Sequence, residues 1–147
     1  MAEDAALPDF EDPPIAEVVL AVHFERMPHL TGPAVGLLWD RFFSEQFHTI
    51  EERPPYEPPQ ERFGTDERGV RFAFSDEVPS PRYWLVGKDK SELLQVQPNW
   101  FARNWRKAGS SDPYPRYEVI RQRFLSDFET FRSHCSEQGL GEIVPEQ

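Results

Sequence analysis

The chain has 147 residues, 38% of them hydrophobic and 14% aromatic, which is enough to fill the core of one domain. Its formal net charge of −10 argues against general binding to nucleic acids or anionic membranes, because both require a basic surface. Cys135 is the one cysteine, so an internal disulfide is excluded, and no apolar run is long enough to cross a membrane. The acidic N-terminus does not resemble a secretion signal, and a reducing, cytoplasmic setting is expected.

The N-terminal part of the chain predicts a leader followed by a strand. Residues 1–12 are acidic and without period, so we expect a flexible leader there, a single domain over 13–138 and a short tail over 139–147. Alternation over Ile15–Arg26 predicts a long first strand. One face of this strand is wholly apolar, as expected of a sheet covered on one side, and carries Val18, Leu20, Val22 and Phe24.

The next predicted element is a helix over Pro33–Ile50, with Thr31 as its cap. Apolar residues at helical spacing predict its buried side, namely Val35, Leu38, Trp39, Phe42, Phe43 and Phe47. The proline-rich segment Arg53–Pro59 cannot be helical and is expected to cross the surface in an extended form. A stiff connector is the favoured interpretation of this segment, and docking on a proline-reading module is the alternative.

Four further strands are expected after this connector. Arg62–Asp66 and Val70–Ser75 predict a hairpin, and Arg82–Lys88 predicts a strand that ends in a tight turn. The last strand opens the stretch Ser91–Lys107 and is expected to pair antiparallel with its predecessor. Pro98 predicts a bulge or an edge position for this strand, because proline cannot donate a hydrogen bond to the ladder.

The last predicted element is a second helix that begins at Asp112 or Tyr114 and stops at Gly139. Its buried face recurs at spacings of three and four and carries Tyr117, Ile120, Phe124, Phe128, Phe131 and Cys135. The order of elements is then strand, helix, four strands and helix. The sequence therefore predicts an α+β fold, with an antiparallel sheet of about five strands and both helices packed on one face.

Four short motifs stand in order along the chain, namely Pro13–Leu20 (PPIAEVVL), Leu94–Gln97 (LQVQ), Asn104–Arg106 (NWR) and Tyr114–Tyr117 (YPRY). Together they resemble the N-terminal half of a sporadically distributed family of uncharacterised bacterial proteins. The resemblance implies the same order of elements. Members of the family continue into a second half of comparable size, and this sequence resembles the first half alone. Where the family has an acidic residue and an arginine before the NWR motif, this chain has Pro98, Asn99 and Trp100. The family has no established activity, so the resemblance implies no mechanism.

No motif for catalysis or for a cofactor is found in the sequence. The histidines are His23, His29, His48 and His134, and they lack the spacing of metal ligands. We therefore expect neither a metal nor a cofactor. Cys135 lies on the apolar stripe of the second helix and is interpreted as a core residue rather than a nucleophile.

Polar and basic side chains gather around the last strand and the start of the second helix. Gln95, Gln97 and Asn99 share one strand face by the period of two, and Arg103 is expected to extend that face. The neighbouring candidates along the chain are Asn104, Arg106, Arg116 and Tyr117. Amides and guanidinium groups on a rigid sheet suit a planar anion, a base edge or an extended peptide. In the alternative interpretation, Arg106 and Arg116 anchor the start of the helix to the sheet.

The sequence favours a non-catalytic binding or protein-interaction module with an unknown protein partner. One alternative is an enzyme, a hydrolase or a nucleotide-handling protein, whose catalytic groups are scattered along the chain. The other is a nucleic-acid-binding module that uses the local basic patch in Asn99–Arg123 and its tryptophans. An unpaired edge strand or an uncovered sheet face would also permit a homodimer.

Overall fold

The computed structural model describes residues 10–56, 79–109 and 113–144. Over these ranges the chain has an α+β fold, with a five-stranded antiparallel sheet and two helices in the predicted order. The strands are β1 (Glu17–His23), β2 (Phe47–Arg53), β3 (Arg82–Gly87), β4 (Glu92–Gln97) and β5 (Trp100–Arg106). The helices are α1 (Gly32–Leu38), which a π-helical turn (Trp39–Phe43) continues, and α2 (Tyr117–Glu137).

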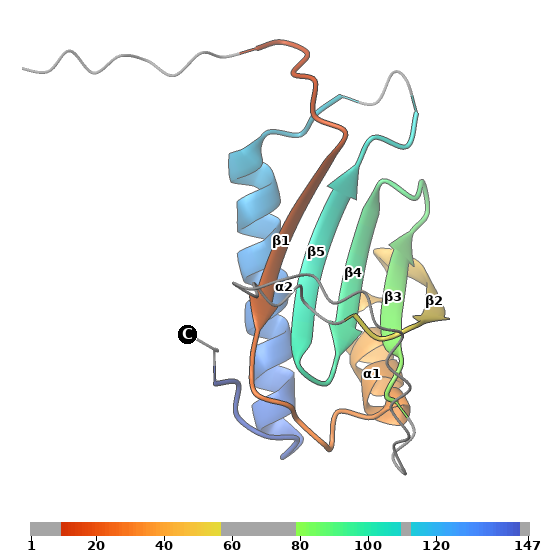
Figure 1. Cartoon of the computed structure of the whole chain (residues 1–147), viewed down its shortest axis with the longest axis vertical. Coiled ribbons are helices and arrows are strands. Elements are labelled where there is room, and N and C mark those ends of the chain that lie inside the picture. The colour runs from red at the N-terminus through yellow and green to blue at the C-terminus, as the bar shows by residue number, and fades with distance from the viewer. Residues whose placement is uncertain (1–9, 57–78, 110–112, 145–147) are drawn as a thin grey trace, which may run out of the picture.

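The strands lie in the order β1-β5-β4-β3-β2, so β1 and β2 form the two edges of the sheet (Figure 1). The strand β3 pairs antiparallel with β4 as predicted. The turn between them also lies where the sequence predicts it. Lys90 has a φ of 62°, and the Asp89 Oδ1 atom accepts a hydrogen bond from the Ser91 N–H at 3.0 Å.

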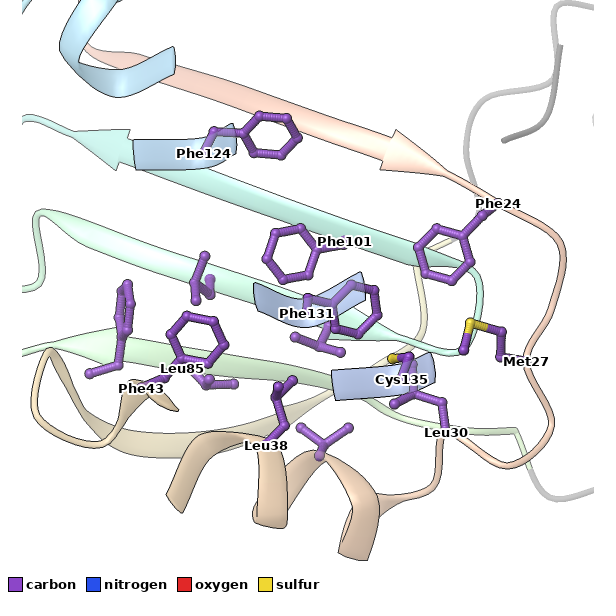
Figure 2. Packing of buried hydrophobic residues seen from close by; sticks show 14 residues of the cluster. Phe24, Met27, Leu30, Leu38, Phe43, Leu85, Phe101, Phe124, Phe131 and Cys135 are labelled. Atoms are coloured by element: carbon purple, nitrogen blue, oxygen red, sulfur yellow. The ribbon is translucent and has the colours of Figure 1, made fainter. Parts of the chain in front are cut away.

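Both helices pack on the same face of the sheet, as predicted (Figure 1). The buried cluster combines Leu38 of α1 and Phe131 of α2 with Leu85, Leu94 and Phe101 of three strands. Figure 2 shows the rings of Phe101 and Phe131 facing each other, and their centroids are 4.7 Å apart. Burial of each such side chain contributes about 1.5–3 kcal/mol, which holds the helices against the sheet.

The first strand and the last helix have the buried faces that the sequence predicts, with one exception. In β1, Leu20 packs against the core whereas Val19 is exposed. In α2, the buried side chains include Ile120, Phe124, Phe131 and Cys135. Tyr117 is exposed, and α2 begins at this residue rather than at Asp112 or Tyr114. The helix stops at Gly139 as predicted, with a φ of 65° at this glycine.

The predicted helix Pro33–Ile50 is wrong at its C-terminal end. A π-helical turn ends the helix, and Phe47–Arg53 forms the edge strand β2. The indole N–H of Trp39 donates to the backbone oxygen of Phe47 at 2.6 Å and holds the chain in this reversal. Phe43 and Phe47 are both buried, so their spacing of four residues imitates a helical stripe although two different elements carry them.

The position predicted for Pro98 is also wrong. Gln97 pairs with Trp100, so Pro98 lies in a two-residue turn between β4 and β5, which are inner strands. A turn suits proline because its φ is fixed and no ladder bond is lost there. The stretch Ser91–Lys107 therefore contains two strands rather than one. The hairpin predicted within residues 62–75 lies outside the described residues.

Candidate functional site

The face of the sheet opposite the helices carries most of the polar side chains that the sequence singles out. We term it the helix-free face, since in the described part of the chain both helices pack on the other side (Figure 1). The register places Gln95 beside Trp84 and Ala102, and Gln97 beside Trp100. Paired residues of neighbouring strands share a face, so these side chains project together from the helix-free face.

A row of hydrogen-bonded side chains crosses the helix-free face from β3 to β1. The Trp84 indole N–H donates to Gln95 Oε1 at 3.2 Å, and Gln95 Nε2 donates to Asn104 Oδ1 at 2.7 Å. Asn104 Nδ2 then donates to Glu17 Oε1 at 2.8 Å. Gln95 and Asn104 are buried, and a buried amide left without these bonds would cost about 1–3 kcal/mol. The row therefore holds the polar side chains of four strands in one arrangement.

Beside this row, the Gln97 side chain holds the main chain of Tyr56. The Tyr56 N–H donates to Gln97 Oε1 at 3.0 Å, and Gln97 Nε2 donates to the Tyr56 backbone oxygen at 2.8 Å. The same nitrogen also donates to Asn99 Oδ1 at 2.7 Å. Backbone N–H and C=O groups are what a sheet edge binds when a strand is added to it. Here a side-chain amide on a sheet face makes the same two contacts.

Aromatic and cationic side chains surround Tyr56. Its ring centroid lies 5.2 Å from that of Trp100, and the Arg82 guanidinium lies 5.6 Å from its centre. His23 packs on Trp100 with ring centroids 4.3 Å apart. Within the described part of the chain, the buried atoms Trp100 Nε1, Arg82 Nε and His23 Nε2 have no hydrogen-bond partner. Unsatisfied buried donors are rare in folded proteins, so this cluster has capacity for acceptor groups of a ligand.

Arg103 does not extend the helix-free face, contrary to the prediction. It pairs with Leu94, so its side chain points to the helix side, where it is 1% exposed. Its guanidinium binds Glu92 Oε2 at 2.7 Å and also Asp127 of α2, and it lies 5.5 Å from the ring of Phe47. The two-residue turn between β4 and β5 shifts the period of two by one residue, so a count carried through the turn reaches the wrong face.

The remaining predicted residues divide between the two sides of the sheet. Asn104 and Arg106 project from the helix-free face of β5. Arg106 Nε donates to the backbone oxygen of Lys90 at 2.9 Å, so it ties β5 to the turn between β3 and β4 rather than to the start of the helix. Arg116, with a φ of 74°, and Tyr117 stand at the start of α2, which packs on the opposite side.

The one cysteine, Cys135, and the neighbouring His134 lie away from this face. Cys135 is buried in the core, and burial raises the pKa of its thiol to about 12, so the thiol stays protonated at neutral pH. Burial, and then the charge of Arg41, lowers the pKa of the neighbouring His134. In the ranges that the structure describes, no group of three or more His, Cys, Asp or Glu side chains could hold a metal ion. What the helix-free face offers is a set of fixed amide donors and acceptors beside aromatic rings.

Several residues of this site are not among those that the sequence singles out. Glu17 and Trp84 stand opposite the core residues of their strands, so alternation alone could have placed them on this face. Trp100 could be placed only once the turn at Pro98 was known. Tyr56 gives no comparable signal, since its contact with Gln97 joins residues 41 positions apart.

Comparisons of the chain with protein-family models, with curated proteins and with solved structures find no match. No family follows from them. The resemblance to the family of uncharacterised bacterial proteins therefore stays a prediction. Among the described residues, α2 and the other helix are too short or too polar to cross a membrane.

Proposed function

We propose that the protein is a non-catalytic interaction module that binds an extended segment of a protein partner on its helix-free face. The contact between Gln97 and the backbone of Tyr56 carries this proposal. Gln97 binds one N–H and one C=O group, which every peptide in an extended form presents. In the proposed complex the partner's segment displaces Tyr56 and makes the same two bonds.

The surroundings of Gln97 favour a partner segment with an aromatic residue. Trp100 and Arg82 flank the Tyr56 ring, and each such contact is worth about 0.5–1.5 kcal/mol beyond burial. Trp100 Nε1 and Arg82 Nε provide unsatisfied donors next to that ring within the described part of the chain. The partner segment therefore combines a tyrosine or phenylalanine with nearby carbonyl or carboxylate acceptors.

The distribution of charge favours a peptide over a nucleic acid. The chain has a net charge of −10, and Gln95, Gln97 and Asn104 are neutral. Arg103, from the middle of the basic stretch, is bound to Glu92 and Asp127 beneath the helices. Binding to phosphates would need exposed basic groups and would weaken steeply with salt. We further propose a cytoplasmic location, in keeping with the buried free thiol of Cys135.

Selection of random peptides on the immobilised full chain tests this proposal. We expect the enriched peptides to share an aromatic residue, and calorimetry should show Gln97→Ala and Trp100→Ala weakening their binding by roughly tenfold each. Leu37→Ala on α1 is the control, because Leu37 is an exposed leucine on the helix side. Tyr56→Ala should bind the same peptides more tightly, since it removes the ring contacts with Trp100 and Arg82 that help to hold this segment in place.

Two results would contradict the proposal. One is enrichment of no peptide by the wild-type chain. The other is a set of peptides that bind Gln97→Ala as tightly as wild type but lose affinity for Leu37→Ala, which would place the binding surface on the helices.

A further inference from the structure

Among the described residues, the outer edge of β1 has unpaired backbone groups at alternate positions. Lys107 N–H donates to the backbone oxygen of Ala16 at 2.8 Å, and Phe24 N–H donates to that of Asn99 at 3.2 Å. Antiparallel ladders alternate, so the even-numbered residues of β1 direct their backbone groups toward β5. The odd-numbered residues direct theirs away from the sheet, and these are Glu17, Val19, Ala21 and His23. In the described part of the chain, β1 is an edge strand that pairs with β5 alone.

The C-terminal tail marks the end of this free edge. Glu25 is the next residue of the outward series, and its N–H donates to the backbone oxygen of Val144 at 3.1 Å. This bond agrees with the alternation and occupies the edge just beyond β1. A strand added to the edge can therefore pair along Glu17–His23 and not further in that direction.

A second copy of β1 fits this edge in one register that uses the whole strand. An antiparallel pair centred on Leu20 places Glu17 opposite His23 and Val19 opposite Ala21. All four residues have outward backbone groups, so each pair exchanges two hydrogen bonds. If one copy of β1 shifted by one residue, its outward backbone N–H and C=O groups would lie opposite residues whose groups point inward, and the hydrogen-bond ladder would be lost.

The side chains along β1 are complementary to themselves in this register. Glu17 of each copy faces His23 of the other, so a carboxylate and an imidazole form a polar pair across the two strands. His23 packs on Trp100 within each copy, which holds its ring on the same face of the sheet as Glu17. On the other face Leu20 meets Leu20, next to the edge of each hydrophobic core.

The helix side has a matching apolar residue, Leu125 of α2, which is 45% exposed. It precedes His134 by about two and a half turns at roughly 3.6 residues per turn, so it projects from the opposite side of α2. His134 contacts Phe42 beside α1, so Leu125 lies on the side of α2 away from α1. Figure 1 shows α2 at the β1 edge of the sheet. Asp127 binds Arg103, the residue that pairs with Leu20, so Leu125 lies near the level of Leu20.

We propose that the protein forms a symmetric dimer through its β1 edge, with the two-fold axis at Leu20. The two sheets join into one, the helix-free faces become continuous, and Leu125 of one copy covers Leu125 of the other. The dimer is independent of the proposed peptide binding, although it would place two such sites on one surface.

Sedimentation over a concentration series and a designed cross-link test the dimer. At a non-hydrogen-bonded pair the Cα atoms are about 4.5 Å apart, which suits a disulfide. Oxidised Leu20→Cys should therefore give a covalent dimer on a non-reducing gel. Val18→Cys is the matched control, since Val18 faces Val22 of the second copy and not itself. Wild type, whose buried Cys135 does not react, should give no covalent dimer.

Two glutamate substitutions on exposed leucines provide a second test that does not alter β1. Leu125→Glu should raise the dimer dissociation constant by roughly tenfold or more, because it places one negative charge from each copy in the dimer interface. Leu37→Glu on α1 should leave the constant unchanged, since Leu37 lies away from the edge. Circular dichroism confirms that each variant is folded.

Three results would overturn the proposal. The first is a chain that sediments as a monomer at every concentration, which is also what pairing of β1 with a different protein predicts. The second is a folded Leu20→Cys variant that forms no more covalent dimer than Val18→Cys. The third is a dimer that Leu37→Glu weakens and Leu125→Glu does not.

Discussion

Arg103 and Asn104 are neighbours in the chain, but the pleat of β5 sends them to opposite faces of the sheet. Arg103 lies beneath the helices and binds the carboxylates of Glu92 and Asp127. Asn104 lies on the helix-free face, in a row of uncharged groups that ends at Glu17. Charge is thus concentrated where the sheet joins α2, and the buried neutral amides lie on the helix-free face. Under the proposed function, stability and recognition belong to opposite faces of one strand.

The two faces should differ most in how far a single substitution lowers the free energy of unfolding. Arg103→Met leaves Glu92 and Asp127 beneath the helices without this cation, and loss of one partner of a buried ion pair costs about 3–5 kcal/mol. Arg106→Ala is the control, because Arg106 is on the other face, where Nε bonds Lys90; its cost should stay near 1 kcal/mol. Urea unfolding measures both. Equal costs would remove the distinction between the faces.

On the helix-free face, we expect a smaller loss from breaking the amide row. Asn104→Ala removes the bonds to Gln95 and Glu17 without leaving a buried charge, and should cost about 1–2 kcal/mol in urea unfolding. Thr49→Ala is the control on an exposed position of the edge strand and should change stability by less than about 0.5 kcal/mol. A cost for Asn104→Ala as large as that for Arg103→Met would show that the row belongs to the folding core.

The contact between Gln97 and Tyr56 should affect local opening more than global stability. Gln97→Ala removes both bonds to the Tyr56 backbone and should speed amide exchange at Tyr56 by roughly fivefold, or about 1 kcal/mol. Gln97→Glu keeps the acceptor for the Tyr56 N–H and loses the donor to its C=O, so it should give an intermediate rate. An unchanged exchange rate in Gln97→Ala would mean that other contacts hold Tyr56.

The smallest expected effect is on the pH dependence of stability. Burial raises the pKa of Asp127, and Arg103 and Arg123 oppose this only in part. Because the folded pKa lies above the unfolded one, the favourable contribution of Asp127 is complete below the usual carboxyl pKa of about 3.9 and is lost as pH rises through the raised pKa. The stability of wild type relative to Asp127→Asn should therefore fall as the pH rises from about 4 through the raised pKa of Asp127. A rise over this interval would mean that Arg103 outweighs burial.

Much of the architecture could be predicted from the sequence because hydrophobic alternation and helical spacing report burial directly. The apolar face of β1, the stripe of α2 and the stop at Gly139 are of this kind. The prediction fails where two elements meet. Phe43 and Phe47 keep helical spacing across the reversal into β2, and Pro98 hides a turn between two inner strands. Both cases involve tertiary contacts that a local pattern does not contain.

The candidate site was predicted only in part, because alternation places residues within one strand but not across a turn. Gln95 and Gln97 could be placed on one face because they alternate within one strand, whereas Asn104 was singled out only as their neighbour along the chain. Arg103 was assigned to the wrong face, because its side depends on the number of residues in the β4–β5 turn. Tyr56 could not be found, because its place beside Gln97 follows from the path of the chain after β2.

The proposed division of the sheet into a structural face and a recognition face is tested most directly by amide NMR spectra during titration with a selected peptide. We predict that the largest shifts occur at Tyr56, at Gln95–Asn99 and at the indole N–H of Trp100. The amides of α1 and of the C-terminal half of α2 should change little. Shifts concentrated on the helices, with Tyr56 and Gln97 unmoved, would contradict the account.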